Sequence, residues 1–189
     1  LAAELIGAGA AFEDAAFLNP DLAATGDNPA SITYSAPSSD STGSTAAAIR
    51  ADLKTLIGNF TSADAALERA VLILHPRSAL HMALLEGTAG GLAFPDLGVR
   101  GGSVCGIPTL TSAACTLSGS PSETFMALID PSRVLFASDD GVQVETARHA
   151  SVQMSDAPAT GAQQLVNLWQ HGLRALKLSI PVAWRAADG

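Results

Sequence analysis

Apolar residues recur at helical spacing through most of the first half of the chain. The predicted helices cover 1–18, 46–58, a short stretch from Thr61 or Ser62 to Arg69, and 76–86. Asn19-Pro20 is expected to end the first helix, because the residue before proline disfavours the helical region. Gly58 and Gly87 are expected to stop the second helix and the last, and Pro76 to open the last at its first position.

Short apolar runs separated by turn residues predict strands in the second half. They cover 71–75, 107–110, 125–130, 134–137, 142–146 and 164–180, with an extended segment over 181–184. The run at 71–75 is apolar throughout, which predicts a strand covered on both faces. Residues 142–146 alternate, which predicts a half-buried strand, and over 164–180 a bent strand is favoured over a helix. Gly101-Gly102 and Asp130-Pro131-Ser132 are interpreted as turns, and Asp139-Asp140-Gly141 as a hairpin.

A long loop over 19–45, rich in Pro, Gly and Ser, separates the first two predicted helices. Loops of this length are uncommon inside a compact domain, so it indicates a linker or a crossing between two subdomains. Residues 35–45 are expected to be the least ordered part, and Ser44 or Thr45 can cap the helix after the loop. Gly7 and Gly9 weaken the first helix, and their small size leaves room for another element to pack closely.

Composition and charge narrow the class of protein. The 189 residues are 48% hydrophobic and 15% charged, which suits a folded chain with a buried core and excludes a disordered one. The net charge of −8 repels phosphate, so no sequence-specific nucleic-acid binding is predicted. The sequence contains no run of 18 apolar residues, so no membrane-spanning helix is predicted. Leu1 is not an initiator methionine and falls within a predicted helix, so the chain is expected to be a fragment of a longer protein.

One segment, Gly101-Gly102-Ser103-Val104-Cys105, approaches the nucleophile elbow of serine hydrolases. That motif needs glycine at its fifth position and a helix after it. Here Cys105 takes the fifth position, and Gly106-Ile107-Pro108 comes next. A Gly-Gly turn leading into a strand is therefore the preferred interpretation. A serine hydrolase using Ser103 with His75 or His149 is kept as an alternative.

No spacing of metal-ligating residues predicts a metal centre. The histidines are His75, His81, His149 and His171. Metal ligation needs three or four converging groups, so each histidine is expected to be structural, with His75 capping the helix over 76–86 and His149 on a partly exposed strand. Cys105 and Cys115 are expected to be two buried thiols, and a single bridge between them stays open. The predicted sets of catalytic, cofactor-binding and metal-binding residues are therefore empty.

Three further patterns have simpler explanations than a binding site. Gly7 to Phe12 lacks the third glycine of a dinucleotide fingerprint and lies inside a predicted helix. Asp139 and Asp140 are interpreted as solvated turn residues rather than as an acid and base pair. Trp169 and Trp184 are expected to pack a sheet against a helix rather than to form a ligand platform.

Several features follow one another in a specific order along the chain. A strand ending in His75-Pro76-Arg77 leads into a helix with Leu-His-Met-Ala-Leu-Leu, and Gly106-Ile107-Pro108 then enters a strand. Five further segments belong to the same pattern: Ala16 to Pro20, Asn28 to Ile32, Leu128 to Asp130 with Val134 to Phe136, Val142 to Met154, and Leu165 to Trp184. This order resembles the major capsid proteins of tailed bacteriophages with the Hong Kong 97-type fold, although Thr146 stands where such proteins usually have serine.

The resemblance implies an α+β (mixed α/β) Hong Kong 97-type fold with a peripheral domain over 1–38 and 141–189 and an axial domain over 39–140. The family's N-terminal arm, extended loop and most of its spine helix would precede Leu1 and are missing from this sequence. Family members that crosslink use Lys and Asn side chains. With Lys54 and Lys177 as the only lysines, no crosslinking is predicted.

The implied function is structural, without enzyme activity or cofactor. The resemblance implies a virion subunit that assembles in the bacterial host cytoplasm with copies of itself into hexamers and pentamers around DNA. A scaffold, a protease and a portal are further implied partners. An encapsulin-like nanocompartment shell is an alternative on the same fold. Neighbouring portal and terminase genes would favour a phage capsid over it.

Overall fold

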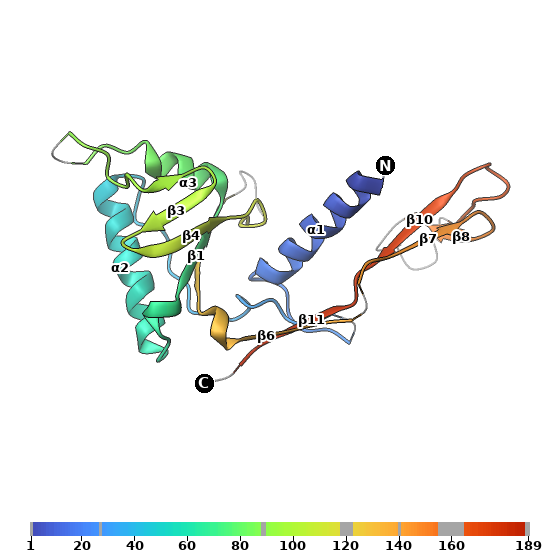
Figure 1. The fold of residues 1–189 in the computed structure, drawn as a ribbon, viewed down its shortest axis with the longest axis horizontal. Helices are drawn as coiled ribbons and strands as arrows, with labels where there is room; N and C mark the ends of the chain where they lie inside the picture. The colour runs from blue at the N-terminus through green and yellow to red at the C-terminus, as the bar shows by residue number, and fades with distance from the viewer. Residues whose placement is uncertain are drawn as a thin grey trace. The chain divides into compact units, whose positions relative to one another are not determined.

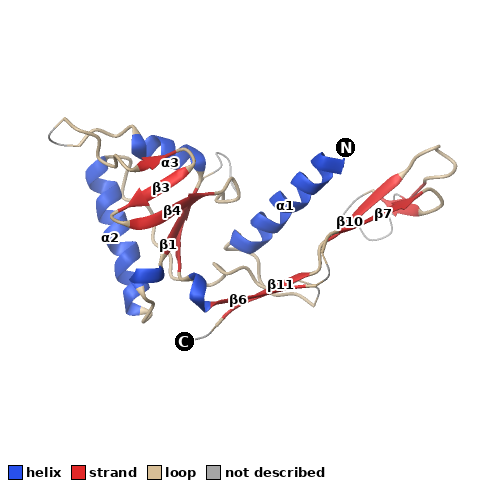
Figure 2. Ribbon diagram, viewed as in Figure 1, coloured by secondary structure: helices blue, strands red, loops and turns tan. Residues whose placement is uncertain are grey.

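The computed structural model of the chain describes residues 2–26, 28–87, 90–117, 123–139, 141–154 and 165–187. Its elements are α1 (Ala2–Leu18), α2 (Ala46–Ser62), η1 (Leu67–Arg69), β1 (Val71–Leu74), α3 (Pro76–Ala83), β2 (Leu97–Gly98), β3 (Gly101–Val104), β4 (Ile107–Thr111), β5 (Met126–Ile129), η2 (Pro131–Arg133), β6 (Val134–Ser138), β7 (Gln143–Ala147), β8 (Ser151–Gln153), β9 (Leu165–Asn167), β10 (Ala175–Ser179) and β11 (Val182–Ala186). Helices and strands are both prominent, which confirms the α+β class (Figure 2).

The chain divides into two compact units. The larger unit comprises Ala10–Ala137 and Ala183–Gly189, and the smaller one comprises Leu1–Gly9 and Ser138–Val182. Strands β1 to β5 lie in the larger unit, and β7 to β10 lie in the smaller one (Figure 1). No helix in the described part of the chain is long and apolar enough to cross a membrane.

A five-stranded sheet with the order β2-β3-β4-β1-β5 organises the larger unit. Its central strand β1 runs parallel to β4 and antiparallel to β5. Helices α2 and α3 bring their apolar side chains onto the face of β1 that carries Leu72 and Leu74, which are almost fully buried. The alternate residues Val71 and Ile73 are only half-buried. The prediction that β1 is covered on both faces is therefore confirmed fully for the face with Leu72 and Leu74 and only in part for the other face.

The helix boundaries agree with the predicted signals in part. α1 ends at Leu18, before Asn19-Pro20, as expected. The hydroxyl of Thr45 caps α2 by accepting from the Ala48 N–H at 3.2 Å, and His75 Nδ1 caps α3 by accepting from the Arg77 N–H at 3.1 Å. Both capping predictions are confirmed, since these side chains satisfy amide donors that have no partner within the helix.

Gly58 and Gly87 do not stop helices. α2 runs through Gly58 to Ser62, and the next helical segment is only the single turn η1, not a helix starting at Thr61 or Ser62. One interior glycine costs about 1 kcal/mol, which the packing of Ile49 and Leu53 in the core offsets. α3 ends at Ala83, three residues before the predicted end, because the chain then turns back so that Glu86 bridges to Leu92.

Gly101 and Gly102 lie inside strand β3 rather than in a turn, which corrects the sequence interpretation. Both have positive φ, +98° and +146°. The tight turn comes later, at Cys105 and Gly106, with φ of +54° and +82° between the paired residues Val104 and Ile107. Positive φ at both central residues matches the type I′ turns that connect hairpin strands.

The last strands pair across long distances in sequence. β6 pairs with β11, β7 with β10, and β8 with β9. The hairpin predicted at Asp139-Asp140-Gly141 is therefore wrong, since β6 and β7 do not pair with each other. Asp140 itself lies outside the described residues, as do 155–164. The single strand predicted over 164–180 is two strands, β9 and β10, separated by a turn. The extended segment after Pro181 is confirmed as β11.

Burial in the smaller unit differs from the alternating pattern of 142–146. Val142 and Val144 are 51% and 52% exposed, so β7 is not half-buried. The close packing expected of the α1 glycines is confirmed at Gly9, where a Cβ would overlap Leu178 Cδ2 and lie 3.2 Å from Ile180 Cδ1. At Gly7, by contrast, an added Cβ would have no atom of another described element within 4 Å.

The loop over 19–45 is confirmed as a connection without helix or strand, and side chains fasten it at two points in the larger unit. The carboxylate of Asp52 on α2 accepts from the Thr42 hydroxyl at 2.7 Å, the Ser41 hydroxyl at 2.9 Å and the Thr42 N–H at 3.1 Å. These bonds, the Thr42 hydroxyl first, hold the pKa of Asp52 below its usual value. At the other point, Ala30 accepts from Trp184 Nε1 at 2.8 Å. The Ser-rich part is thus bonded to α2 rather than unsupported.

Candidate functional site

The geometry around Ser103 does not reproduce a nucleophile elbow. Ser103 is half-buried in the middle of β3, paired with Pro108, and its N–H donates to the Asp96 carbonyl at 3.0 Å. An elbow needs its serine on a turn between a strand and a helix. β3 instead enters the tight turn at Cys105 and continues into strand β4. The segment therefore has a structural role as strand β3 of the five-stranded sheet.

The two histidines considered as bases have other contacts. His75 Nδ1 accepts from the Arg77 N–H as the cap of α3, so that nitrogen is engaged. His149 lies in the smaller unit, and its ring stacks on Trp169 at 5.1 Å between centroids. It occupies an exposed bend after β7 rather than the expected strand, because β7 ends at Ala147. Within the described ranges no hydrogen bond joins either histidine to Ser103 that would make it a base.

The other metal-ligating and aromatic residues also fall in structural positions. His81 is exposed on α3, with Nε2 3.3 Å from the Ser44 carbonyl oxygen, and His171 is exposed in the turn before β10. Among the described residues, no three His, Cys, Asp or Glu side chains converge on a point that could hold a metal ion. Trp184 is buried against Phe17 as expected, whereas Trp169 is 70% exposed.

Both cysteines are free thiols, in contrast to the open possibility of a bridge. Cys115 is fully buried, as predicted, but Cys105 is exposed on the β3–β4 turn, where a two-residue hairpin leaves its side chain in solvent. Burial, together with the negative charge of Asp14, raises the pKa of Cys115 to about 11. The Cys115 thiol is therefore protonated near neutral pH and is a poor nucleophile.

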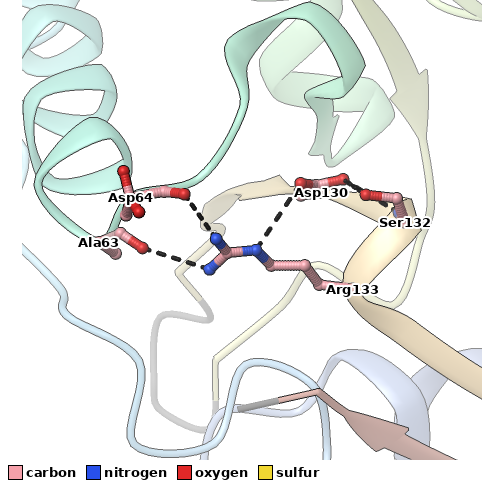
Figure 3. Close-up of polar contacts among 5 residues, drawn as sticks. All are labelled: Ala63, Asp64, Asp130, Ser132 and Arg133. Atoms are coloured by element: carbon pink, nitrogen blue, oxygen red, sulfur yellow. Dashed lines mark hydrogen bonds and ion pairs between the residues drawn. The ribbon is translucent and has the colours of Figure 1, made fainter. Parts of the chain in front are cut away.

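A polar cluster centres on Arg133, at the point where β6 begins (Figure 3). Its guanidinium donates from Nη1 to the Ala63 carbonyl at 3.2 Å and from Nη2 to the Asp64 carbonyl, at the C-terminal end of α2. Its Nε lies 3.9 Å from Asp130 Oδ2. Asp130 in turn accepts from the Ser132 hydroxyl at 2.6 Å and from the Ser132 N–H at 3.0 Å. The cluster joins a helix end, the single turn η2 and a strand.

The cluster is not predicted from the sequence, although the sequence does indicate the turn at Asp130-Pro131-Ser132. Asp130-Pro131-Ser132 has the composition of a turn, and the structure shows Asp130 capping η2 with Pro131 at its first position. An Asp cap followed by Pro is a recognisable helix start. The sequence does not show the partner of Arg133, because Ala63 and Asp64 are about 70 positions away and contribute only main-chain oxygens.

Asp130 is expected to make the stability of the protein depend on pH. The Ser132 hydroxyl, with the Ser132 N–H, Arg69 and Arg133, holds its pKa below the usual value, although burial opposes this. A carboxyl whose pKa is lower in the folded state stabilises the protein above its unfolded pKa of about 3.9, and that contribution is lost as the pH falls through the folded pKa. Asp130→Asn should therefore be less stable than the wild type near neutral pH.

The measurement is urea unfolding of Asp130→Asn and wild type at a series of pH values. The gap in unfolding free energy should be constant from neutral pH down to about pH 4 and should then narrow. Asp40→Asn, a change at an exposed carboxyl in the loop, is the control and should show a much smaller gap. A gap for Asp130→Asn that stays constant down to about pH 2 would contradict the assignment.

Known proteins of similar sequence indicate the class to which this chain is similar. No family model matches the chain. A capsid polyprotein of Pseudomonas phage PAJU2 is 30% identical over 175 residues, which cover 90% of this chain and 26% of the polyprotein. The chain is thus similar to a phage capsid polyprotein along most of its length. The resemblance to tailed-phage capsid proteins that the sequence indicated is thereby confirmed, and the chain spans about a quarter of the length of this curated relative.

A solved phage structure has a similar fold. A protein of Mycobacterium phage Cain superposes with a TM-score of 0.53 at 16% identity, covering 93% of this chain and 54% of that one. At this identity the likeness concerns the fold alone. The fold is thus shared with a phage protein, in agreement with the order of motifs. The boundaries of the peripheral and axial domains stay predictions.

Proposed function

We propose that this chain is part of the major capsid subunit of a tailed phage or prophage, which assembles with copies of itself into hexamers and pentamers around DNA. The observation that supports this most is the match to a phage capsid polyprotein along 90% of the chain. In this proposal residues 1–38 and 141–189 form the peripheral domain and 39–140 the axial domain. The virion is its location, and assembly takes place in the host cytoplasm.

The exposed surfaces suit a protein that works by contacting neighbours. Two-stranded ribbons are marginal on their own in water, and here they carry large apolar side chains. Leu135 and Phe136 on β6 are 62% and 58% exposed, and Val144 on β7 is 52% exposed. Apolar side chains at this exposure favour burial against another molecule. Acidic character, with a net charge of −8, limits attraction to the phosphates of packaged DNA.

The test is assembly of the full-length protein that contains this chain. Negative-stain electron microscopy should show closed shells, and light scattering of the 189-residue chain alone should show monomers or small rings. The full-length protein is the material of choice because the chain spans about a quarter of the length of its relative. Scaffold, protease and portal are proposed partners, so the experiment is repeated with the neighbouring head genes co-expressed.

The outcomes separate the alternatives. Shells enclosing DNA in the presence of the head genes support a phage capsid. Shells that fill with a cargo enzyme instead support an encapsulin-like compartment. A folded full-length protein that stays monomeric at high concentration, with and without the head genes, overturns the proposal. Labelling of Ser103 by a fluorophosphonate probe would then reopen the hydrolase alternative.

A further inference from the structure

Arg133 caps the C-terminal end of α2. The last carbonyls of an α-helix lack intrahelical donors, and they form the negative end of the helix dipole. α2 ends at its C-cap Ala63, and the chain then turns through Asp64, whose φ is +54°. The guanidinium of Arg133 donates to both (Figure 3). A planar group with several donors in a fixed fork is suited to bond two such oxygens at once.

Asp130 holds the same guanidinium from its other side. Its side chain is 5% exposed, and its carboxylate lies 3.9 Å from Arg133 Nε. Two bonds from Ser132 fix the orientation of that carboxylate, at 2.6 Å from the hydroxyl and 3.0 Å from the N–H. Arg133 is thus held between β5, which ends at Ile129, and the end of α2. A side chain with partners on both sides has little freedom to swing.

The same residue lies at the root of the β6–β11 ribbon. Val134, the next residue, is the first of β6, and the carbonyl of Arg133 accepts from the N–H of Ala187, just past the end of β11, at 2.6 Å. Both strands of the ribbon therefore meet at Arg133. Trp184 fastens β11 to Phe17 and Ala30, whereas the side-chain bonds of Arg133 tie the ribbon to α2.

We propose that Arg133 is a positioning residue that sets the direction in which the β6–β11 ribbon leaves α2 and the five-stranded sheet. This inference rests on the proposed function for its biological meaning. In a closed ring of identical subunits, each interface must repeat at the same angle, since an angle that varies gives open or irregular assemblies. A ribbon with exposed Leu135 and Phe136 can meet a second copy at one angle only if its root is fixed.

The direct test measures the spread of ribbon positions. Spin labels are placed on Cys105, which is exposed at the β3–β4 turn, and on Ala137→Cys, which is exposed on β6. Cys115 is fully buried and is expected to stay unlabelled. Pulsed dipolar spectroscopy of the folded chain should give one narrow distance distribution. Arg133→Ala should broaden it roughly twofold or more, because the root then has no fixed partner at α2.

Two variants keep the test decisive. Arg77→Ala is the matched control, because Arg77 is exposed on α3 in the same unit and its side chain has no hydrogen bond or ion pair among the described residues. It should leave the distribution narrow. Arg133→Lys keeps the charge but cannot bond both carbonyls in a plane, so it should give intermediate broadening and serves if Arg133→Ala does not fold. An unchanged width in both Arg133 variants overturns the inference.

Assembly of the full-length protein then separates this inference from the proposed function. If wild-type protein forms shells, Arg133→Ala should form fewer closed shells and more irregular particles, whereas Arg77→Ala should match the wild type. Regular shells at wild-type yield from Arg133→Ala would overturn the role of Arg133 in assembly. If the wild type forms no shells under any condition, the proposed function fails, and the spin-label widths still decide whether Arg133 positions the ribbon.

Discussion

Replacing Trp184 with alanine is expected to lower the free energy of unfolding of the larger unit by about 3–5 kcal/mol, the range for removing a large buried ring. Trp184 is 7% exposed on β11, and its ring meets Phe17 of α1 edge-on at 5.3 Å between centroids. Its Nε1–H donates to the Ala30 carbonyl at 2.8 Å. One side chain therefore joins the C-terminal strand, the end of α1 and the long loop. Urea unfolding followed by circular dichroism measures the loss.

Two variants separate the causes of that loss. Trp184→Phe keeps most of the ring packing and removes the donor to Ala30, so it should cost about 1–3 kcal/mol, because a buried carbonyl loses its partner and the ring is smaller. Trp169→Ala removes the other tryptophan, which is 70% exposed and stacks on His149, and should cost less than about 1 kcal/mol. Equal costs at Trp184 and Trp169 would contradict the assignment of Trp184 to the core.

Local signals in the sequence locate most elements because the physics that sets them is local. Pro20 disfavours helical backbone in the residue before it, so the end of α1 can be predicted. Thr45 and His75 cap their helices through bonds to amides only two or three residues away. The apolar run at β1 marks a central strand, since such a strand has neighbours on both sides. The error at Gly58 arises because tertiary packing outweighs a propensity of about 1 kcal/mol, whereas the error at Gly87 arises because α3 already ends at Ala83, where the chain turns back.

Pairing between distant segments is not predictable in the same way. Leu176 pairs with Thr146 and Leu178 with Val144, across about thirty residues. The sequence of neither strand indicates which other strand it pairs with. Asp139 and Gly141 suggest a local hairpin, yet the Asp139 N–H bonds to Pro181 because β6 pairs with β11. The sequence contains the turn formers, but the choice among partners depends on the energy of the whole sheet.

The Arg133 cluster and the resemblance to capsid proteins show two different limits. Arg133 donates to the main-chain oxygens of Ala63 and Asp64. Every residue has a main-chain carbonyl, so the sequence does not indicate which ones accept these bonds. The resemblance rests on the order of several weak motifs, and the relationship to a phage capsid polyprotein confirms it. Order along the chain thus indicates the fold, whereas the contacts that rigidify it become visible only in three dimensions.

Replacing Gly102 with alanine is expected to destabilise the larger unit by about 3 kcal/mol or more, because a steric conflict adds to backbone strain of order 1–3 kcal/mol. Gly102 has a φ of +146°, a region that side chains rarely allow. A Cβ built on it would overlap the carbonyl oxygen of Asp96, a main-chain atom that cannot rotate away. The same carbonyl accepts the Ser103 N–H at 3.0 Å, so moving it would break the contact between β2 and β3.

A neighbouring glycine provides the matched control for this experiment. Gly98 on β2 pairs with Gly101, and a Cβ on it would lie 3.8 Å from the Gly101 carbonyl oxygen, an ordinary contact distance. Gly98→Ala should therefore change stability by no more than about 1 kcal/mol, the scale of glycine's backbone entropy. Urea midpoints and thermal unfolding of both variants decide the matter. If Gly102→Ala were as stable as Gly98→Ala, β2 and β3 would not approach each other this closely. That result would favour the interpretation of Gly101-Gly102 as a turn.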